Sequence, residues 1–155
     1  MSRDILGWRK LFGVMGPSTN TVVQPDYDAL RPAGVTNHYS RIFTPDSDAV
    51  SNESFRAGIS VISGNTMDAV RSVMTCHPDY LVMGMSAITF FGGQKGADDF
   101  VAQVRDVSGL GISIGSHSCT AALKRLDGDG VDAIVRVDTN LSMIRVAAAV
   151  ELWLG

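Results

Sequence analysis

The sequence is poor in the residues that build metal sites and disulfide frameworks. It holds two cysteines, Cys76 and Cys119, and three histidines in 155 residues. Two cysteines do not make a disulfide framework, and the scattered histidines have no spacing that is typical of a zinc site. We therefore expect free thiols and no bound metal.

Long apolar runs and clusters of one charge are also missing. No apolar run approaches the ~20 residues that a membrane-spanning helix needs. Charged residues interrupt the first ten positions, where a signal peptide has its apolar region. The net charge is −3 and no Lys/Arg cluster offsets it, so nothing favours nucleic acid as a partner. These observations predict a cytoplasmic protein that binds neither membranes nor nucleic acid.

Glycine-rich phosphate motifs are absent too. There is no Gly-x-Gly-x-x-Gly after the first predicted strand and no Walker loop, which argues against a dinucleotide or a nucleoside triphosphate. What remains is an ordinary globular composition, with 45% hydrophobic and 19% charged residues. A chain of this length forms one domain most simply.

The residues that are present alternate between strand and helix patterns. Short β-branched or apolar runs predict strands, and apolar residues that recur every three to five positions predict helices. The predicted strands span residues 10–15, 35–43, 80–83, 109–114 and 131–137, and the predicted helices span residues 25–31, 47–76 with a break near 63–65, 97–105, 120–126 and 140–154. This alternation predicts an α/β fold, a mainly parallel sheet with helices on both faces.

Four loops are expected to meet at the carboxyl edge of this sheet, where open α/β folds bind their ligands. They span residues 16–21, 84–93, 115–119 and 137–142 and are rich in hydroxyl and amide side chains. Neutral donors beside helix N-termini suit a carboxylate or a similar small anion. The alternative is that each of these residues only caps a helix.

Two of these loops resemble a known superfamily. Residues 16–26 (GPSTNTVVQPD) and residues 78–93, which contain PDYLVMGMS and FFGG, resemble the maleate cis-trans isomerase and arylmalonate decarboxylase branch of the aspartate/glutamate racemase superfamily. The similarity continues to residue 126 and resumes at residues 130–155. The resemblance implies a flavodoxin-like lobe of the Asp/Glu racemase fold. It also implies an enediolate-like intermediate made from a small mono- or dicarboxylate, without metal or organic cofactor.

The resemblance also suggests roles for individual residues. Ser86 and Asp138 are the expected catalytic residues: Ser86 would donate to the charge that develops, and Asp138 is either a base or the cap of the next helix. The expected substrate-binding residues are Ser18, Asn20, Thr21, Ser86, Thr89 and Asn140.

The chain departs from the superfamily in its cysteines and its length. The two cysteine positions fall on Met85 and Asp138, and a thioether cannot carry a proton, so racemisation by two thiols is excluded. Family members are usually longer, and the similarity skips at residues 127–130. We therefore expect a single α/β domain over residues 1–155, with part of the second lobe missing at that junction. Because the family site lies between two lobes, we also expect a homo-oligomer.

Three hypotheses follow. The first is a lyase or isomerase that acts on a small dicarboxylate. The second, motivated by Met85 and Asp138, is a catalytically silent carboxylate-binding protein of the same fold. The third is a rearranged gene product whose fold survives without a site.

Overall fold

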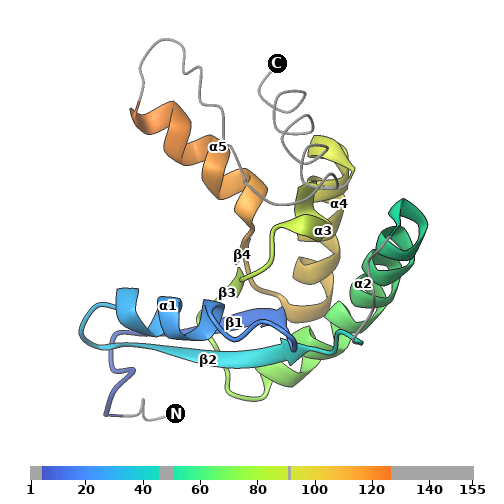
Figure 1. Cartoon of the computed structure of the whole chain (residues 1–155). Coiled ribbons are helices and arrows are strands. Elements are labelled where there is room, and N and C mark those ends of the chain that lie inside the picture. The colour runs from blue at the N-terminus through green and yellow to red at the C-terminus, as the bar shows by residue number, and fades with distance from the viewer. Residues whose placement is uncertain (1–4, 46–50, 91, 127–155) are drawn as a thin grey trace.

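The structure is a computed structural model that describes residues 5–45, 51–90 and 92–126 (Figure 1). The predicted strand at 131–137 and helix at 140–154 lie outside these residues, as do Asp138 and Asn140. The elements are β1 (Lys10–Pro17), α1 (Val23–Leu30), β2 (Val35–Ile42), α2 (Asn52–Met74), β3 (Tyr80–Met83), α3 (Ala87–Phe90), α4 (Gly93–Ser108), β4 (Ile112–Ser113) and α5 (Gly115–Leu126).

The described strands form one parallel sheet in the order β2-β1-β3-β4. β1 is central: it pairs with β2 along its whole length and, through residues 12–15, with residues 80–83 of β3. β3 in turn pairs with β4 at Leu81–Ile112 and Val82–Ser113. Because every strand runs in the same direction, all carboxyl ends lie at one edge. The predicted parallel α/β sheet is confirmed.

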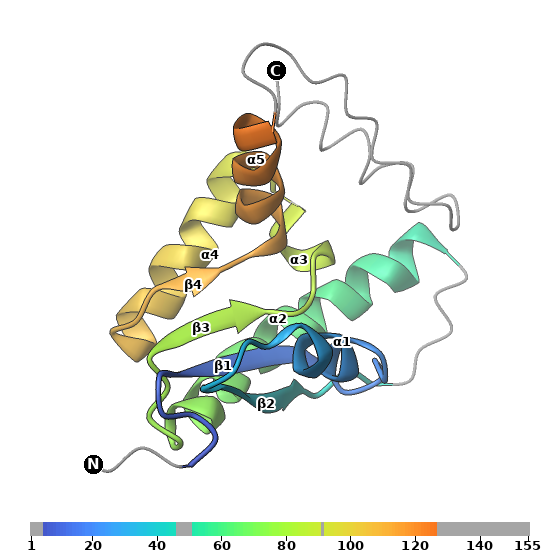
Figure 2. The same ribbon diagram turned by 90° about the vertical axis from the view of Figure 1, so that its left-hand side faces the viewer.

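Helices cover both faces of this sheet (Figures 1 and 2). The chain steps from β1 to β2 in one direction and then back across β1 to β3 and β4. Right-handed crossovers therefore place α1 on the opposite face from α2 and α4. The main core lies under α2 and α4, where burial of each large apolar side chain contributes about 1.5–3 kcal/mol. Its members include Met15, Ile42, Val70, Val73, Leu81, Val104 and Ile114.

The helix α2 is continuous, and the predicted break near residues 63–65 is wrong. A capping box between Ser51 and Ser54 begins the helix. Ile62, Thr66 and Val70 are buried on its inner face, and this burial continues across Gly64. A glycine inside a helix costs only about 0.5–1 kcal/mol relative to alanine, which the buried face offsets.

Three other helices begin earlier than predicted. α1 starts at Val23 rather than at residue 25, α4 at Gly93 rather than 97, and α5 at Gly115 rather than 120. In α4 and α5, polar and glycine residues that precede the predicted helices form the first turn. In α5, for example, the Ser118 N–H already donates to the Ile114 carbonyl at 3.0 Å. A further short helix, α3, lies inside the predicted loop at 84–93.

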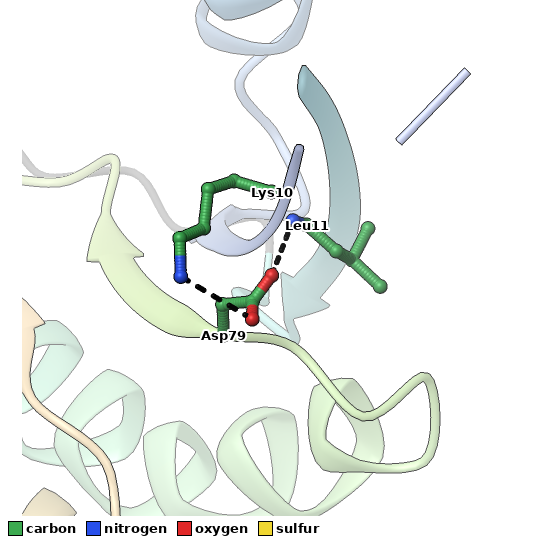
Figure 3. Close-up of polar contacts among 3 residues, drawn as sticks. All are labelled: Lys10, Leu11 and Asp79. Atoms are coloured by element: carbon green, nitrogen blue, oxygen red, sulfur yellow. Dashed lines mark hydrogen bonds and ion pairs between the residues drawn. The ribbon is translucent and has the colours of Figure 1, made fainter. Parts of the chain in front are cut away.

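Asp79 joins β1 and β3 at the opposite edge of the sheet, where both strands begin (Figure 3). Its backbone N–H donates to the Leu11 carbonyl at 2.8 Å, and its carboxylate Oδ2 accepts from the Leu11 N–H at 2.8 Å. The Lys10 Nζ lies 3.5 Å from Oδ1. This carboxylate thus satisfies a backbone donor at the start of the central strand. The bonds of Asp79 to Leu11 fix the register of β3 against β1, and this register sets where the two strands end relative to each other.

Candidate functional site

The segments that follow β1, β3 and β4 lie next to one another at the carboxyl edge. The Gly84 N–H, just after β3, donates to the Met15 carbonyl of β1 at 2.6 Å. A Cβ placed on Gly115, just after β4, would lie 3.3 Å from the Ser86 Cβ. The described chain therefore brings three of the four predicted loops together, and the fourth lies outside the described residues.

The loop after β1 contains three predicted binding residues with different surroundings. The Ser18 hydroxyl accepts from the Thr44 N–H at 2.9 Å and lies 3.3 Å from the Thr44 carbonyl, to which it donates. Asn20 Oδ1 accepts from the N–H groups of Val22 and Val23, both at 2.9 Å. These bonds cap the start of α1, whereas the Asn20 Nδ2 donates to none of the described residues. Thr21 is exposed.

The loop after β3 holds the other two described candidates. Ser86 is exposed, and its carbonyl accepts from the Thr89 N–H at 2.9 Å and from the Thr89 hydroxyl at 2.8 Å. Thr89 is only 1% exposed, so its hydroxyl holds the first turn of α3 rather than facing solvent. Of the pair, only the Ser86 hydroxyl is open to a ligand.

Met85, at the position that the resemblance assigns to a cysteine, packs half-buried against the core. Neither thiol of the chain replaces that cysteine. Cys76 follows α2 and lies three positions before Asp79, near the opposite edge of the sheet, and its Sγ lies 3.1 Å from the Val73 carbonyl. Burial raises the pKa of the Cys76 thiol, which keeps it protonated and weakly nucleophilic. Cys119 is half-buried in α5, after the first turn of that helix.

Two buried hydroxyls lie at this edge: one belongs to the predicted loop at 115–119 and the other belongs to none of the predicted loops. Tyr39 Oη and Ser116 Oγ are both inaccessible to solvent and have no hydrogen-bond partner in the described part of the chain. Tyr39 was interpreted only as a strand residue. The signal that points to it is the polar alternation of Asn37, Tyr39 and Arg41, which is unusual in a strand of a covered sheet. Ser116 lies in the first turn of α5.

The chemistry available at this edge is that of neutral hydrogen-bond donors. Within residues 5–45, 51–90 and 92–126, no group of three His, Cys, Asp or Glu side chains is placed to hold a metal ion. No helix of the same residues is long and apolar enough to cross a membrane. Amide, hydroxyl and backbone N–H donors beside the N-terminus of a helix are suited to hold a small anion.

Two solved structures of the maleate cis-trans isomerase of Nocardia farcinica are similar to this chain. One is a mutant with a covalently bound succinylcysteine intermediate, with a TM-score of 0.62 and 19% identity. The other is bound to TRIS, with a TM-score of 0.61 and 18% identity. The described residues have the isomerase fold. Each match covers 76% of this chain and 49% of the isomerase chain, so the chain spans about half the length of that enzyme. No family model and no curated protein sequence matches it.

Proposed function

We propose that this chain belongs to the aspartate/glutamate racemase superfamily and binds a small mono- or dicarboxylate at the carboxyl edge of its sheet. On this proposal it isomerises or decarboxylates the ligand through an enediolate-like intermediate, without a cofactor. The observation that carries the proposal is the meeting of three strand-end loops, furnished with uncharged donors, in a fold shared with a maleate isomerase.

The surroundings of the predicted residues suggest a division of roles. The Nδ2 of Asn20, which donates to none of the described residues, and the hydroxyls of the exposed residues Thr21 and Ser86 are the donors that we assign to the carboxylate. Ser18 and Thr89 act mainly by shaping the loops, because their hydroxyls donate to main-chain carbonyls. Ser86 would also stabilise the negative charge that develops on the enediolate. Asp138 and Asn140 keep the roles of base and binding residue on the strength of the resemblance alone.

A second candidate function is carboxylate binding without turnover. It is favoured by Met85, which supplies packing at the position where the resemblance implies a reactive thiol. A thioether neither transfers a proton nor adds to a double bond. On this alternative the donors at the strand ends are retained and the proton chemistry is lost.

We also propose that the chain works as a homo-oligomer. The proposal rests on its length, about half that of the isomerase that it resembles in fold. On this proposal a second copy contributes to the site. Sedimentation equilibrium is expected to give at least twice the mass of one chain, and a monomeric mass would contradict the proposal.

The function is tested with a panel of maleate, substituted malonates and amino dicarboxylates. At a ligand concentration of about 100 times Kd, binding stabilises the folded state by ~2.7 kcal/mol. That corresponds to a rise in Tm of roughly 5–10 °C for a chain of this size. Such a rise with turnover supports the enzyme, and a rise without turnover supports the binding protein. If no member of the panel shifts the Tm, both candidates are wrong.

A further inference from the structure

One face of β2 holds α1 against the sheet by polar contacts. Asn37, Tyr39 and Arg41 share this face because side chains alternate along a strand. Asn37 Nδ2 donates to the Tyr27 carbonyl at 2.8 Å. Arg41 donates to the Asn20 carbonyl and to Gln24 Oε1, both at 2.9 Å. Tyr39 lies between these two residues, and its hydroxyl makes no comparable bond to the described chain.

The Tyr39 hydroxyl lies at the end of β1, at the carboxyl edge of the sheet that forms the candidate site. It occupies the space that a Cβ on Gly16 would need, and the Gly84 carbonyl lies 3.4 Å from that same point. The Arg41 guanidinium carbon lies 5.0 Å from the centroid of the Tyr39 ring. The hydroxyl is thus directed at the ends of β1 and β3, the two strands whose loops hold Asn20 and Ser86.

The fold itself does not explain this hydroxyl. Buried polar groups in proteins are almost always hydrogen-bonded, because desolvation without a partner costs free energy. A phenylalanine at position 39 would keep the ring, its packing and its contact with Arg41 while avoiding that cost. Residues that carry such a cost are often retained for a ligand.

We propose that the Tyr39 hydroxyl donates a hydrogen bond to the carboxylate of the ligand, at the end of β1. The inference rests on the proposed function and adds to it a donor from β2. Burial raises the pKa of the Tyr39 phenol, an effect that the nearby Arg41 partly opposes. The group therefore stays protonated at neutral pH and acts as a donor.

A ligand reaches this hydroxyl only when its cover shifts. The neighbouring side chains come from α1 and β2: Val23 and Tyr27 lie over Gly84, and Arg41 lies over the ring. No residue of α1 is fully buried, although Val23 and Tyr27 are half-buried. The contacts of Asn37 and Arg41 and the Asn20 bonds add to the packing of these two side chains. On this proposal, a displacement of α1 opens the hydroxyl when the ligand binds.

The test compares Tyr39→Phe with Tyr27→Phe, a matched removal of a phenol hydroxyl from the neighbouring position. The probe is the member of the maleate and malonate panel that binds wild type most tightly, and its Kd is measured by calorimetry. Tyr39→Phe is expected to weaken binding at least tenfold, or ~1.4 kcal/mol, with a Tm no lower than that of wild type. Tyr27→Phe is expected to leave the Kd within about twofold of the wild-type value.

A second arm tests the position of the hydroxyl without any ligand. Gly16→Ala is expected to lower the Tm, because the new Cβ meets the Tyr39 hydroxyl. Adding Tyr39→Phe to that variant should restore part of the loss. No recovery in the double variant would show that the hydroxyl does not lie at Gly16 and would overturn the inference.

The remaining outcomes separate the inference from the proposed function. If wild type binds the probe and Tyr39→Phe binds it equally well, the inference is wrong and the proposed function stands. If Tyr39→Phe lowers the Tm, the hydroxyl has a structural partner and the inference is also wrong. If wild type binds no member of the panel, the proposed function fails and the inference fails with it.

Discussion

At the scale of single residues, the candidate site depends on side chains that serve the fold and remain available to a ligand. Asn20 is the clearest case, since Oδ1 caps α1 while Nδ2 is left without a partner in the described chain. Met85 is the opposite case, because its side chain is committed to packing. A substitution that removes the Nδ2 donor of Asn20 but keeps the Oδ1 bonds to α1 is therefore more informative than truncation of the side chain to alanine.

Tyr27 of α1 and Tyr39 of β2 are expected to make the stability of the protein sensitive to alkaline pH. Burial raises the pKa of both Tyr27 and Tyr39 above 10.0. A group with a raised folded-state pKa contributes stability that is fully present below its unfolded pKa and is lost as pH rises through the folded pKa. The free energy of unfolding is thus expected to fall more steeply above about pH 10 in wild type than in Tyr39→Phe. Urea denaturation at several pH values measures this, and equal slopes would contradict it.

The carboxylate of Asp79 is expected to matter for stability although it lies at the edge opposite the site. Asp79→Ala removes the acceptor of the Leu11 N–H, and loss of a charged acceptor costs about 1–3 kcal/mol. Asp68→Ala is the control: it removes an exposed ion pair with Arg71, which is worth ~0–1 kcal/mol. Chemical denaturation of both variants measures the difference. Equal losses would show that Asp79 does not hold the start of β1.

At the scale of elements, the approach of α1 to the strand ends is the feature that shapes the site. A Cβ placed on Gly84 would lie only 2.6 Å from the Val23 side chain of α1. A Cβ placed on Gly16 would likewise meet the Tyr39 hydroxyl of β2. Glycine therefore stands at the penultimate position of β1 and directly after β3, because side chains of α1 and β2 fill the space that a Cβ would need there.

Gly84→Ala and Gly64→Ala form a matched pair that tests this packing. Gly84→Ala forces its new Cβ against Val23 and the Met15 carbonyl, so we expect a loss of about 1–3 kcal/mol. A Cβ on Gly64 meets nothing within 4 Å. Gly64→Ala, in the middle of α2, is therefore expected to gain about 0.5–1 kcal/mol. If Gly84→Ala were neutral in thermal denaturation, α1 would not pack on the strand ends as described.

The sequence predicted the elements better than it predicted their ends. Buried strands such as β1 and β3 carry continuous apolar runs, and the amphipathic pattern of α2 is long, so their existence was evident. The break near Gly64 was wrong because propensity is local, whereas burial of Ile62 and Val70 acts on the whole helix. Tyr39 was missed for a related reason: whether its hydroxyl finds a partner depends on residues of β1, which are distant in sequence.

At the scale of the whole molecule, the described residues bring three strand-end loops together at one edge of the sheet. The chain has the fold of a maleate isomerase over 76% of its own length but spans 49% of that enzyme. The proposed donors come from the loops after β1 and β3, with a further hydroxyl in the first turn of α5. The central claim is that these donors bind a small carboxylate at the carboxyl edge.

Calorimetric titration of maleate and malonate into wild type and Asn20→Asp tests this claim most directly. An aspartate oxygen can accept from the N–H groups of Val22 and Val23 as the Asn20 Oδ1 does, so the variant is expected to keep its fold while it replaces the Nδ2 donor with a negative charge. Gln103→Glu, at an exposed position of α4, adds the same charge elsewhere and serves as the control. We expect saturable binding by wild type and Gln103→Glu and a loss of at least tenfold in Asn20→Asp. Equal affinities in all three proteins, or no binding by wild type, would contradict the account.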